Sequence, residues 1–337
     1  MASAQDILLG AQAGAVVLPV CDHYSGVEVR MRKSLALQAE MQAEFGACVF
    51  DVTLDCEDGA PVGGETEHAH MVAELALAAA ASSGGKARVA VRVHPVDHPH
   101  FAQDMAIIVG KAGDALSHIM LPKVERPEDV DFAKKVAMSP SGGDIALQVL
   151  IESPAAVQRA FDIAAHPAVQ SLSFGLMDFV SAHGGAIPAQ AMSSEGQFSH
   201  PLVIRAKLEI ASACHAHGKV PAHGVVTEFA DAVKMQLAAK RASQELGYTR
   251  MWSIHPSQIR PILAAFSPTD AEIDNACAIL DAAQAAQWAP ISHGGALHDR
   301  ASYRYYWQVI ERAHRTGRAL DARIAHFLPK TCNETLP

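Results

Sequence analysis

The stretch Leu150-Ile-Glu-Ser-Pro154 and the later Phe174-Gly-Leu-Met-Asp178 decide the fold that this sequence predicts. In each, a short apolar run leads into a carboxylate, which is Glu152 in the first and Asp178 in the second. Short apolar runs bounded by proline and glycine indicate buried strands. Carboxylates at the ends of two consecutive strands can bind one hard cation together, whereas a single one can simply cap the helix that follows. Because two occur in succession, we favour a metal site at Glu152 and Asp178 over two helix caps.

The rest of the chain repeats the strand-then-helix pattern about eight times. Strands are expected at residues 15–20, 47–54, 87–93, 115–121, 146–151, 169–174, 220–226 and 249–254. This alternation over roughly 250 residues is typical of a closed parallel (β/α)8 barrel, the TIM barrel of the α/β class. An open doubly wound sheet is the rival, and the absence of a glycine-rich loop after the first strand counts against it.

The barrel is expected to occupy residues 12–265, and residues 266–337 form a C-terminal helical extension. Within the extension we expect a helix at 273–286, a glycine-containing loop at 292–296 and a long helix at 302–325. Since eight units already close a barrel, the extension is interpreted as a lid or an oligomer arm. Its aromatic run at 303–307 is expected to pack on a neighbouring subunit or, alternatively, on its own barrel.

Composition narrows the class of protein. The chain has 337 residues, half of them hydrophobic, so it can bury a large core. A formal net charge of −9 and the lack of a basic stripe argue against a nucleic-acid partner. Six scattered cysteines without a CxxC pair suit reduced thiols rather than disulfides or a zinc site. With no signal-peptide pattern and no stretch long enough to span a membrane, we expect a cytoplasmic protein.

Arg92 ends an apolar strand, where its planar guanidinium can bind a substrate carboxylate through two parallel hydrogen bonds. The alternative is an internal salt bridge to Asp55, Glu57 or Asp58, which crowd the end of the preceding strand. Crowded carboxylates either share the field of a cation or raise one another's pKa.

Two further side chains follow strands. Lys123 could form a Schiff base if its pKa were lowered, but a salt bridge to Glu152 or Glu125 is the favoured interpretation. His255 precedes a proline at a helix start, where it is either a base or a structural residue.

Read together, six motifs resemble the citrate lyase β-subunit-like branch of the HpcH/HpaI aldolase superfamily, which also includes malyl-CoA lyases. In family order they are Asp55-Cys-Glu-Asp-Gly59, Val91-Arg-Val93, Met120-Leu-Pro-Lys-Val-Glu125, Leu150-Ile-Glu152, Phe174-Gly-Leu-Met-Asp178 and Ile254-His-Pro-Ser-Gln-Ile259. The resemblance implies a TIM barrel, a homotrimer or homohexamer, and Mg²⁺ bound by Glu152 and Asp178. It also implies that Arg92 holds the oxoacid end of the substrate. Asp299, in the similar stretch Gly295-Ala-Leu-His-Asp299, would reach a neighbouring subunit's site.

The chain departs from the family pattern at two places that concern the acyl partner. Family members begin with Arg-Ser-x-Leu-x-x-Pro, whereas Val16-Val-Leu-Pro-Val20 has no arginine before it. Where the helix after the acidic motif usually carries Lys or Arg, this chain has Glu65-Thr-Glu-His-Ala-His70. The use of CoA is therefore left open.

We predict a Mg²⁺-dependent carbon–carbon lyase or aldolase that acts on a small 2-oxo acid and an acyl-CoA or acyl-thioester. Arg92, Gly175 and Lys123 are predicted to contact the substrate, and Asp299, or failing that Asp58, to move the proton. Two alternatives stay open: a class II aldolase on free pyruvate and an aldehyde without CoA, and a non-catalytic subunit or paralogue of a lyase complex.

Overall fold

The computed structural model describes residues 4–10, 17–137 and 141–318. These residues form two compact units, of which one comprises residues 17–265 and the other joins residues 4–10 to residues 266–318. The segment at the N-terminus therefore belongs with the C-terminal residues.

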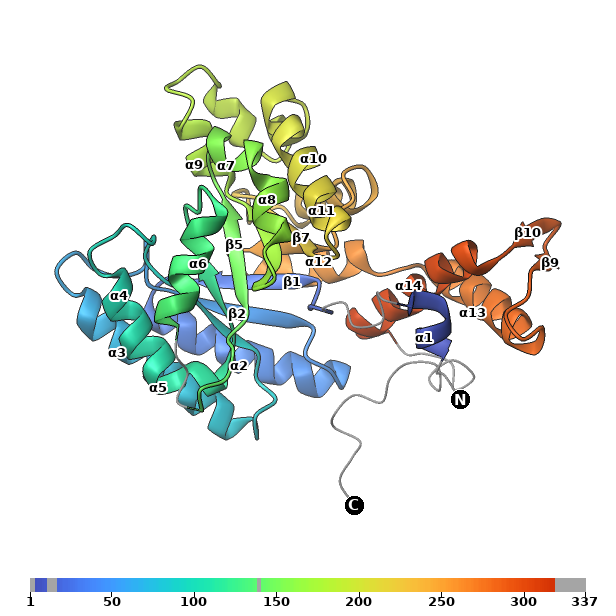
Figure 1. The fold of residues 1–337 in the computed structure, drawn as a ribbon, viewed down its shortest axis with the longest axis horizontal. Coiled ribbons are helices and arrows are strands. Elements are labelled where there is room, and N and C mark those ends of the chain that lie inside the picture. Colours follow the sequence, from blue (N-terminus) through green and yellow to red (C-terminus); the bar gives the residue numbers. More distant parts are fainter. Residues whose placement is uncertain (1–3, 11–16, 138–140, 319–337) are drawn as a thin grey trace. The chain divides into compact units, whose positions relative to one another are not determined.

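The larger unit is a closed barrel of eight parallel strands in sequential order, with β1 paired to β8 (Figure 1). The strands are β1 (Cys21–Ser25), β2 (Phe50–Asp55), β3 (Val89–Arg92), β4 (Leu116–Leu121), β5 (Leu147–Ile151), β6 (Val169–Phe174), β7 (Val220–His223) and β8 (Arg250–Ser253). The predicted TIM barrel is confirmed.

Helices alternate with the strands. They are α2 (Glu28–Phe45), α3 (Glu65–Ser82), α4 (Phe101–Asp104), α5 (Gly110–Ala112), α6 (Pro127–Val136), α7 (Pro154–Gln158), α8 (Ala160–Ala165), α9 (Leu176–Ser181), α10 (Pro201–Ala216), α11 (Ala232–Gln244) and α12 (Pro256–Phe266). Local chemistry sets several of their ends. Gly46 ends α2 in the left-handed region at φ 69°. Ser153 begins α7 by accepting a hydrogen bond from the Ala156 N–H, with Pro154 at the first helical position.

The prediction of the first strand was wrong. The strand lies at Cys21–Ser25, after the apolar run at 15–20, of which residues 15 and 16 lie outside the described residues. A polar residue in β1 obscured the strand: Asp22 is fully buried and accepts a hydrogen bond from Thr53 at 2.7 Å. An apolar pattern search misses a strand whose polar side chains face a polar barrel interior.

Ion pairs fill part of that interior. The Arg250 side chain is fully buried and pairs with Asp22 at 2.8 Å and with Asp51 at 2.7 Å. Nearer the carboxyl ends of the strands the interior is apolar, where Met120, Leu150, Ala222 and Trp252 form one buried cluster. This apolar cluster lies beneath the rim where the strands end.

The smaller unit comprises α1 (Ala4–Leu9), α13 (Asp270–Ala285), the hairpin β9 (Ile291–His293) with β10 (Ala296–His298), and α14 (Arg300–Arg315). Of the loop predicted at 292–296, only Gly294 and Gly295 form the turn of this hairpin, and the other three residues belong to its strands. The long helix ends at Arg315, and residues 319–325 of its predicted span lie outside the described residues. Tyr303 and Trp307 are buried in this unit's own core with residues of α1 and α13, while Tyr305 is exposed. The expected docking of the aromatic run elsewhere is wrong for these two side chains.

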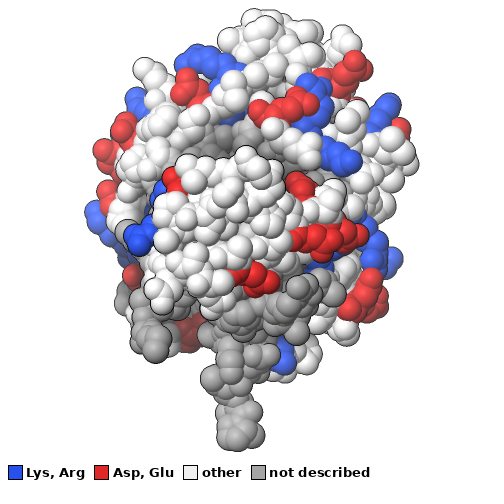
Figure 2. Space-filling view, turned by 90° about the vertical axis from the view of Figure 1, so that its right-hand side faces the viewer, with Lys and Arg blue, Asp and Glu red and all other residues white. Residues whose placement is uncertain are grey.

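None of the helices in the described ranges has the length and apolar character that a membrane crossing requires. On the face shown in Figure 2, Lys and Arg side chains are interspersed with Asp and Glu and form no continuous basic surface.

Candidate active site

Parallel strands end at the same rim of a barrel, and the polar strand-end residues of this chain are joined there by hydrogen bonds and ion pairs. Arg92, the last residue of β3, pairs with Glu57 at 2.7 Å. The same Glu57 pairs with the Lys123 ammonium at 2.7 Å. The backbone N–H of Lys123 donates to Glu152 at 2.8 Å. The ends of β2, β3, β4 and β5 thus contribute to one connected site.

Arg92 has the internal partners that were the alternative to substrate binding. Its guanidinium contacts Asp55 at 2.7 Å, Glu57 at 2.7 Å and Asp58 at 2.8 Å. These three partners differ in accessibility: Asp55 is fully buried, whereas the Asp58 side chain is 73% exposed. The prediction that Arg92 binds substrate stays a prediction.

Glu152 is the most perturbed carboxylate of the site. Its side chain is buried, and burial, followed by the negative charges of Glu57 and Asp178, raises its pKa to about 7. The hydrogen bond from the Lys123 N–H opposes this rise in pKa. Lys123 has a φ of 52°, a left-handed conformation that non-glycine residues rarely adopt. The chain therefore uses a strained residue to orient Glu152.

Gly175 leaves room for Glu152. A methyl group added at Gly175 would lie 2.3 Å from the Glu152 Cγ and 2.4 Å from its Oε1. The Gly175 N–H donates to the Ile151 carbonyl at 3.0 Å. The predicted contact of Gly175 with the substrate stays a prediction. Gly175 serves the site through its missing side chain.

Asp178 lies in the first turn of α9 and is exposed. Its charge raises the pKa of both Glu152 and Lys123, which places it at the same rim as Glu152. Glu152 caps no helix, because Ser153 takes that role for α7. The helix-cap alternative therefore fails for Glu152.

The donor set fits a hard divalent cation. Five carboxylates (Asp55, Glu57, Asp58, Glu152 and Asp178) are opposed by two cationic side chains (Arg92 and Lys123). Among the described residues, no three His, Cys, Asp or Glu side chains are grouped to hold a metal ion. Glu152 and Asp178, the predicted ligands, would supply two oxygens, and Mg²⁺ commonly keeps several positions for water and substrate.

The prediction for the partner of Lys123 was wrong, since its ammonium pairs with Glu57 instead of Glu125 or Glu152. Burial lowers the pKa of Lys123 and Glu57 raises it, with a net rise. A lysine held protonated is a poor Schiff-base nucleophile, which supports the earlier preference against that role.

His255 and Asp299 have local roles. The His255 Nδ1 shares a hydrogen bond of 2.7 Å with Ser257 at the start of α12, and its ring stacks on Phe229. Asp299, in the smaller unit, is the N-cap of α14 and accepts from the N–H groups of Ala301 and Ser302. Its predicted role in a neighbouring subunit stays a prediction.

Sequence reasoning missed Tyr24, which lies beside Arg92. The Tyr24 hydroxyl donates to Asp55 and accepts from Arg92 at 2.9 Å, and its ring stacks on Trp252. Tyr24 was missed because the first strand was predicted too early in the chain. With the strand at its observed position, Asp22 and Tyr24 alternate along β1 and share one face.

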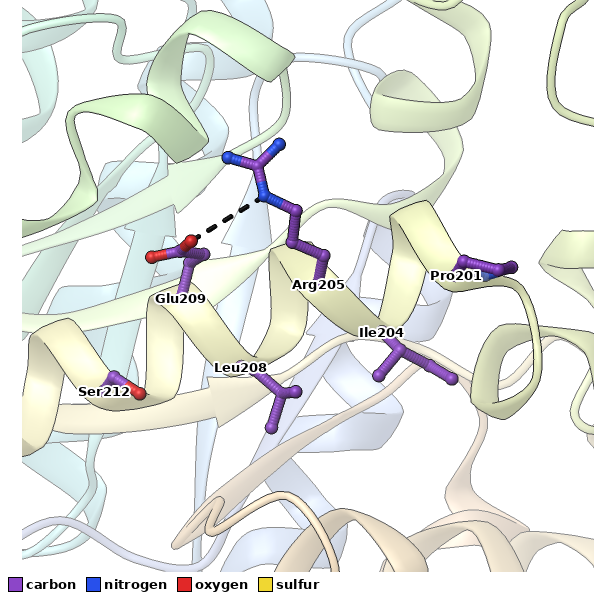
Figure 3. Close-up of a pocket in the computed structure, with 6 residues that line it drawn as sticks. All are labelled: Pro201, Ile204, Arg205, Leu208, Glu209 and Ser212. Atoms are coloured by element: carbon purple, nitrogen blue, oxygen red, sulfur yellow. Dashed lines mark ion pairs between the residues drawn. The ribbon is translucent and has the colours of Figure 1, made fainter.

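A surface pocket of about 490 Å³ lies elsewhere, along the outer face of α10 (Figure 3). It is lined by Pro201, Ile204, Arg205, Leu208, Glu209 and Ser212. Arg205 and Glu209 form a salt bridge of 3.7 Å at its edge. No residue of the strand-end site lines this pocket, so it has no part in the candidate chemistry.

The barrel of this chain matches known proteins. The family model of HpcH/HpaI aldolase/citrate lyase matches residues 34–256. An L-malyl-CoA/beta-methylmalyl-CoA lyase of Cereibacter sphaeroides is 32% identical over 247 residues, which cover 68% of this chain and 77% of the relative. The crystal structure of a citrate lyase from Burkholderia xenovorans is 50% identical, with a TM-score of 0.79, and the match covers 94% of this chain and 98% of that one.

A more distant structure shares the fold. Protein CitE of Mycobacterium tuberculosis, solved with magnesium, acetoacetate and coenzyme A, is 20% identical with a TM-score of 0.66. The match covers 88% of this chain and 98% of that one. The predicted family resemblance is confirmed: this chain belongs to the HpcH/HpaI aldolase/citrate lyase family.

Proposed function

We propose that this protein is a Mg²⁺-dependent carbon–carbon lyase that splits or joins a small 2-oxo acid and an acyl thioester. The observation that carries the proposal is the buried carboxylate of Glu152, whose pKa is raised to about 7 by burial and by the charges of Glu57 and Asp178. The Lys123 N–H orients this carboxylate, and the missing side chain of Gly175 leaves room for it. A desolvated carboxylate next to another carboxylate is stabilised by a bound cation. The lyase activity of the Cereibacter relative and the magnesium in the Mycobacterium structure support this assignment.

Each residue then has a defined task. Glu152 and Asp178 would hold Mg²⁺, which when bound supplies Lewis-acid polarisation of the oxo-acid carbonyl. Arg92 binds a substrate carboxylate through its planar donors. Lys123 opposes the rise that burial causes in the pKa of Glu57, and it adds positive charge to the rim. Asp299 from a neighbouring subunit, or failing that Asp58, moves the proton.

A class II aldolase acting on free acids is the second candidate. The observation that favours it is the start of α3, where Glu65 and Glu67 occupy the first turn. Acidic side chains at that place repel a phosphate-rich group such as that of CoA, whereas they do not hinder a small aldehyde.

The deciding experiment is a turnover panel of 2-hydroxyacyl-CoA thioesters and 4-hydroxy-2-oxo acids, assayed with Mg²⁺ and with EDTA. We expect Mg²⁺-dependent cleavage of at least one thioester, and loss of that activity in Glu152→Gln. Cleavage of free acids alone would select the second candidate. No turnover of either class by a folded protein would support a non-catalytic subunit.

A further inference from the structure

The three acidic partners of the Arg92 guanidinium differ in how deeply their side chains are buried. Asp55 accepts from its Nε at 2.7 Å and is fully buried. Glu57 is nearly buried and is shared with Lys123. Asp58 accepts from Nη2 at 2.8 Å, yet its side chain is 73% exposed. Exposed ion pairs contribute little free energy, while breaking a buried one is costly, so Asp58 is the partner that can be exchanged.

Tyr24 contacts the same guanidinium through both its hydroxyl and its ring. Its hydroxyl accepts from the Arg92 Nη2 at 2.9 Å and donates to Asp55. The Arg92 Cζ lies 4.8 Å from the centre of the Tyr24 ring, within the range of a cation–π contact. The ring is itself held by Trp252, with centroids 6.0 Å apart and planes inclined by 20°. Burial raises the pKa of Tyr24, so its hydroxyl stays a donor.

We infer that Tyr24 is the positioning residue of Arg92, and that the substrate carboxylate takes the place of Asp58 on that guanidinium. This inference rests on the proposed function, because it requires that Arg92 meets a carboxylate substrate. Tyr24 and Asp55 fix the orientation of the planar group, so the donor released by Asp58 faces the arriving anion. The displaced Asp58 then lies next to the substrate, where it is available for proton transfer.

The test is a calorimetric titration of pyruvate, in the presence of Mg²⁺, into the wild-type protein and three variants. Tyr24→Phe keeps the ring but loses the hydroxyl, so we expect the Kd of pyruvate to rise roughly tenfold, as for loss of one hydrogen bond to a charged group. Asp58→Asn removes the competing anion, so the Kd should fall about threefold. Tyr305→Phe, at an exposed tyrosine of the smaller unit, is the matched control and should bind as wild type. Methyl pyruvate, which lacks the carboxylate, should not distinguish the four proteins.

With the substrate found in the turnover panel, Tyr24→Phe should raise KM and leave kcat within about twofold, since positioning acts on binding. An unchanged Kd in Tyr24→Phe with intact thermal stability overturns the positioning role. Weaker binding of pyruvate by Asp58→Asn overturns the inference that the substrate carboxylate replaces Asp58 on Arg92. If the wild type turns over a substrate and either result occurs, the proposed function stands and the inference falls. If the wild type neither turns over the panel nor binds pyruvate, both fall.

Discussion

At the scale of single residues, Glu152 couples cation binding to pH. Its pKa is raised to about 7 by burial and by the charges of Glu57 and Asp178. Below that pH the carboxyl group carries a proton that it must lose before binding a cation. We therefore expect Mg²⁺ affinity to fall with pH below about 7, by up to roughly tenfold per unit, and to level off above it.

Calorimetry at about pH 6 in two buffers of different ionisation enthalpy should detect the released proton. Glu152→Gln should weaken Mg²⁺ binding and remove the proton release. A wild-type affinity that is flat between about pH 5.5 and pH 8 would show that Glu152 is not a ligand.

Gly175 gives a second prediction at this scale. In Gly175→Ala the new methyl group would lie 2.3 Å from the Glu152 side chain, so Glu152 must move away from the position that the Lys123 N–H fixes. We expect Mg²⁺ affinity and kcat/KM to fall at least tenfold, on the scale of one lost ligand contact. Gly110→Ala is the control, since Gly110 is helical and a methyl group there meets no atom within 4 Å. Equal Mg²⁺ affinity in the two variants would show that the space at Gly175 is not needed to position Glu152.

Much of the site was predictable because each residue lies at the end of a buried strand or shortly after it. Glu152, Asp178 and Arg92 could be placed at one rim from the apolar runs before them. The pairing of Lys123 with Glu57 could not, because it joins the ends of β4 and β2 across β3. Such a contact depends on how far each loop reaches over the barrel mouth, which leaves no local pattern in the sequence.

At the scale of elements, β1 shows why a strand can escape an apolar search. Its buried Asp22 forms an ion pair with Arg250 from β8, a residue 228 positions away in the chain. The polar residue is tolerated only because the barrel closes and brings the two strands together. No window of local sequence contains that information, so the strand was placed on the apolar residues that precede it.

The same ion pairs support a stability prediction. Arg250→Met leaves Asp22 and Asp51 buried with one partner fewer, and breaking a buried pair typically costs about 3–5 kcal/mol. Chemical denaturation should show a loss of this order in the free energy of unfolding. Arg260→Met, which breaks the exposed pair with Glu44, should change it little. A similar loss of unfolding free energy in both variants would show that the buried ion pairs contribute no more to stability than the exposed one.

At the scale of the whole molecule, the sequence indicated the barrel because eight repeats of one unit leave few other folds. It was less predictable which segments of the chain form the smaller unit. It joins α1 to residues from beyond position 266, and two helices separated by the whole barrel carry no mutual signal in sequence.

The proposed homo-oligomer is tested by mixing two inactive variants. Asparagine is as good an N-cap as aspartate, so Asp299→Asn should keep α14 intact while removing a charge. If Asp299 serves a neighbouring chain, mixed oligomers of Asp299→Asn and Glu152→Gln should recover part of the wild-type activity, since some sites then contain both native residues. Mixed assembly is checked by native mass spectrometry. Confirmed mixing without recovery would place the action of Asp299 within its own chain or nowhere.

The union of α1 with the last helices also has a consequence for synthesis on the ribosome. Leu8 and Leu9 are translated before the residues that cover them, such as Ile310 on α14, which follow about 300 positions later. At the usual elongation speeds of roughly 5–20 residues per second, these leucines wait some tens of seconds for their partners. The barrel can complete its own closure in that interval. During that interval the nascent chain exposes Leu8 and Leu9, which makes α1 a candidate binding segment for chaperones that act on unfinished proteins.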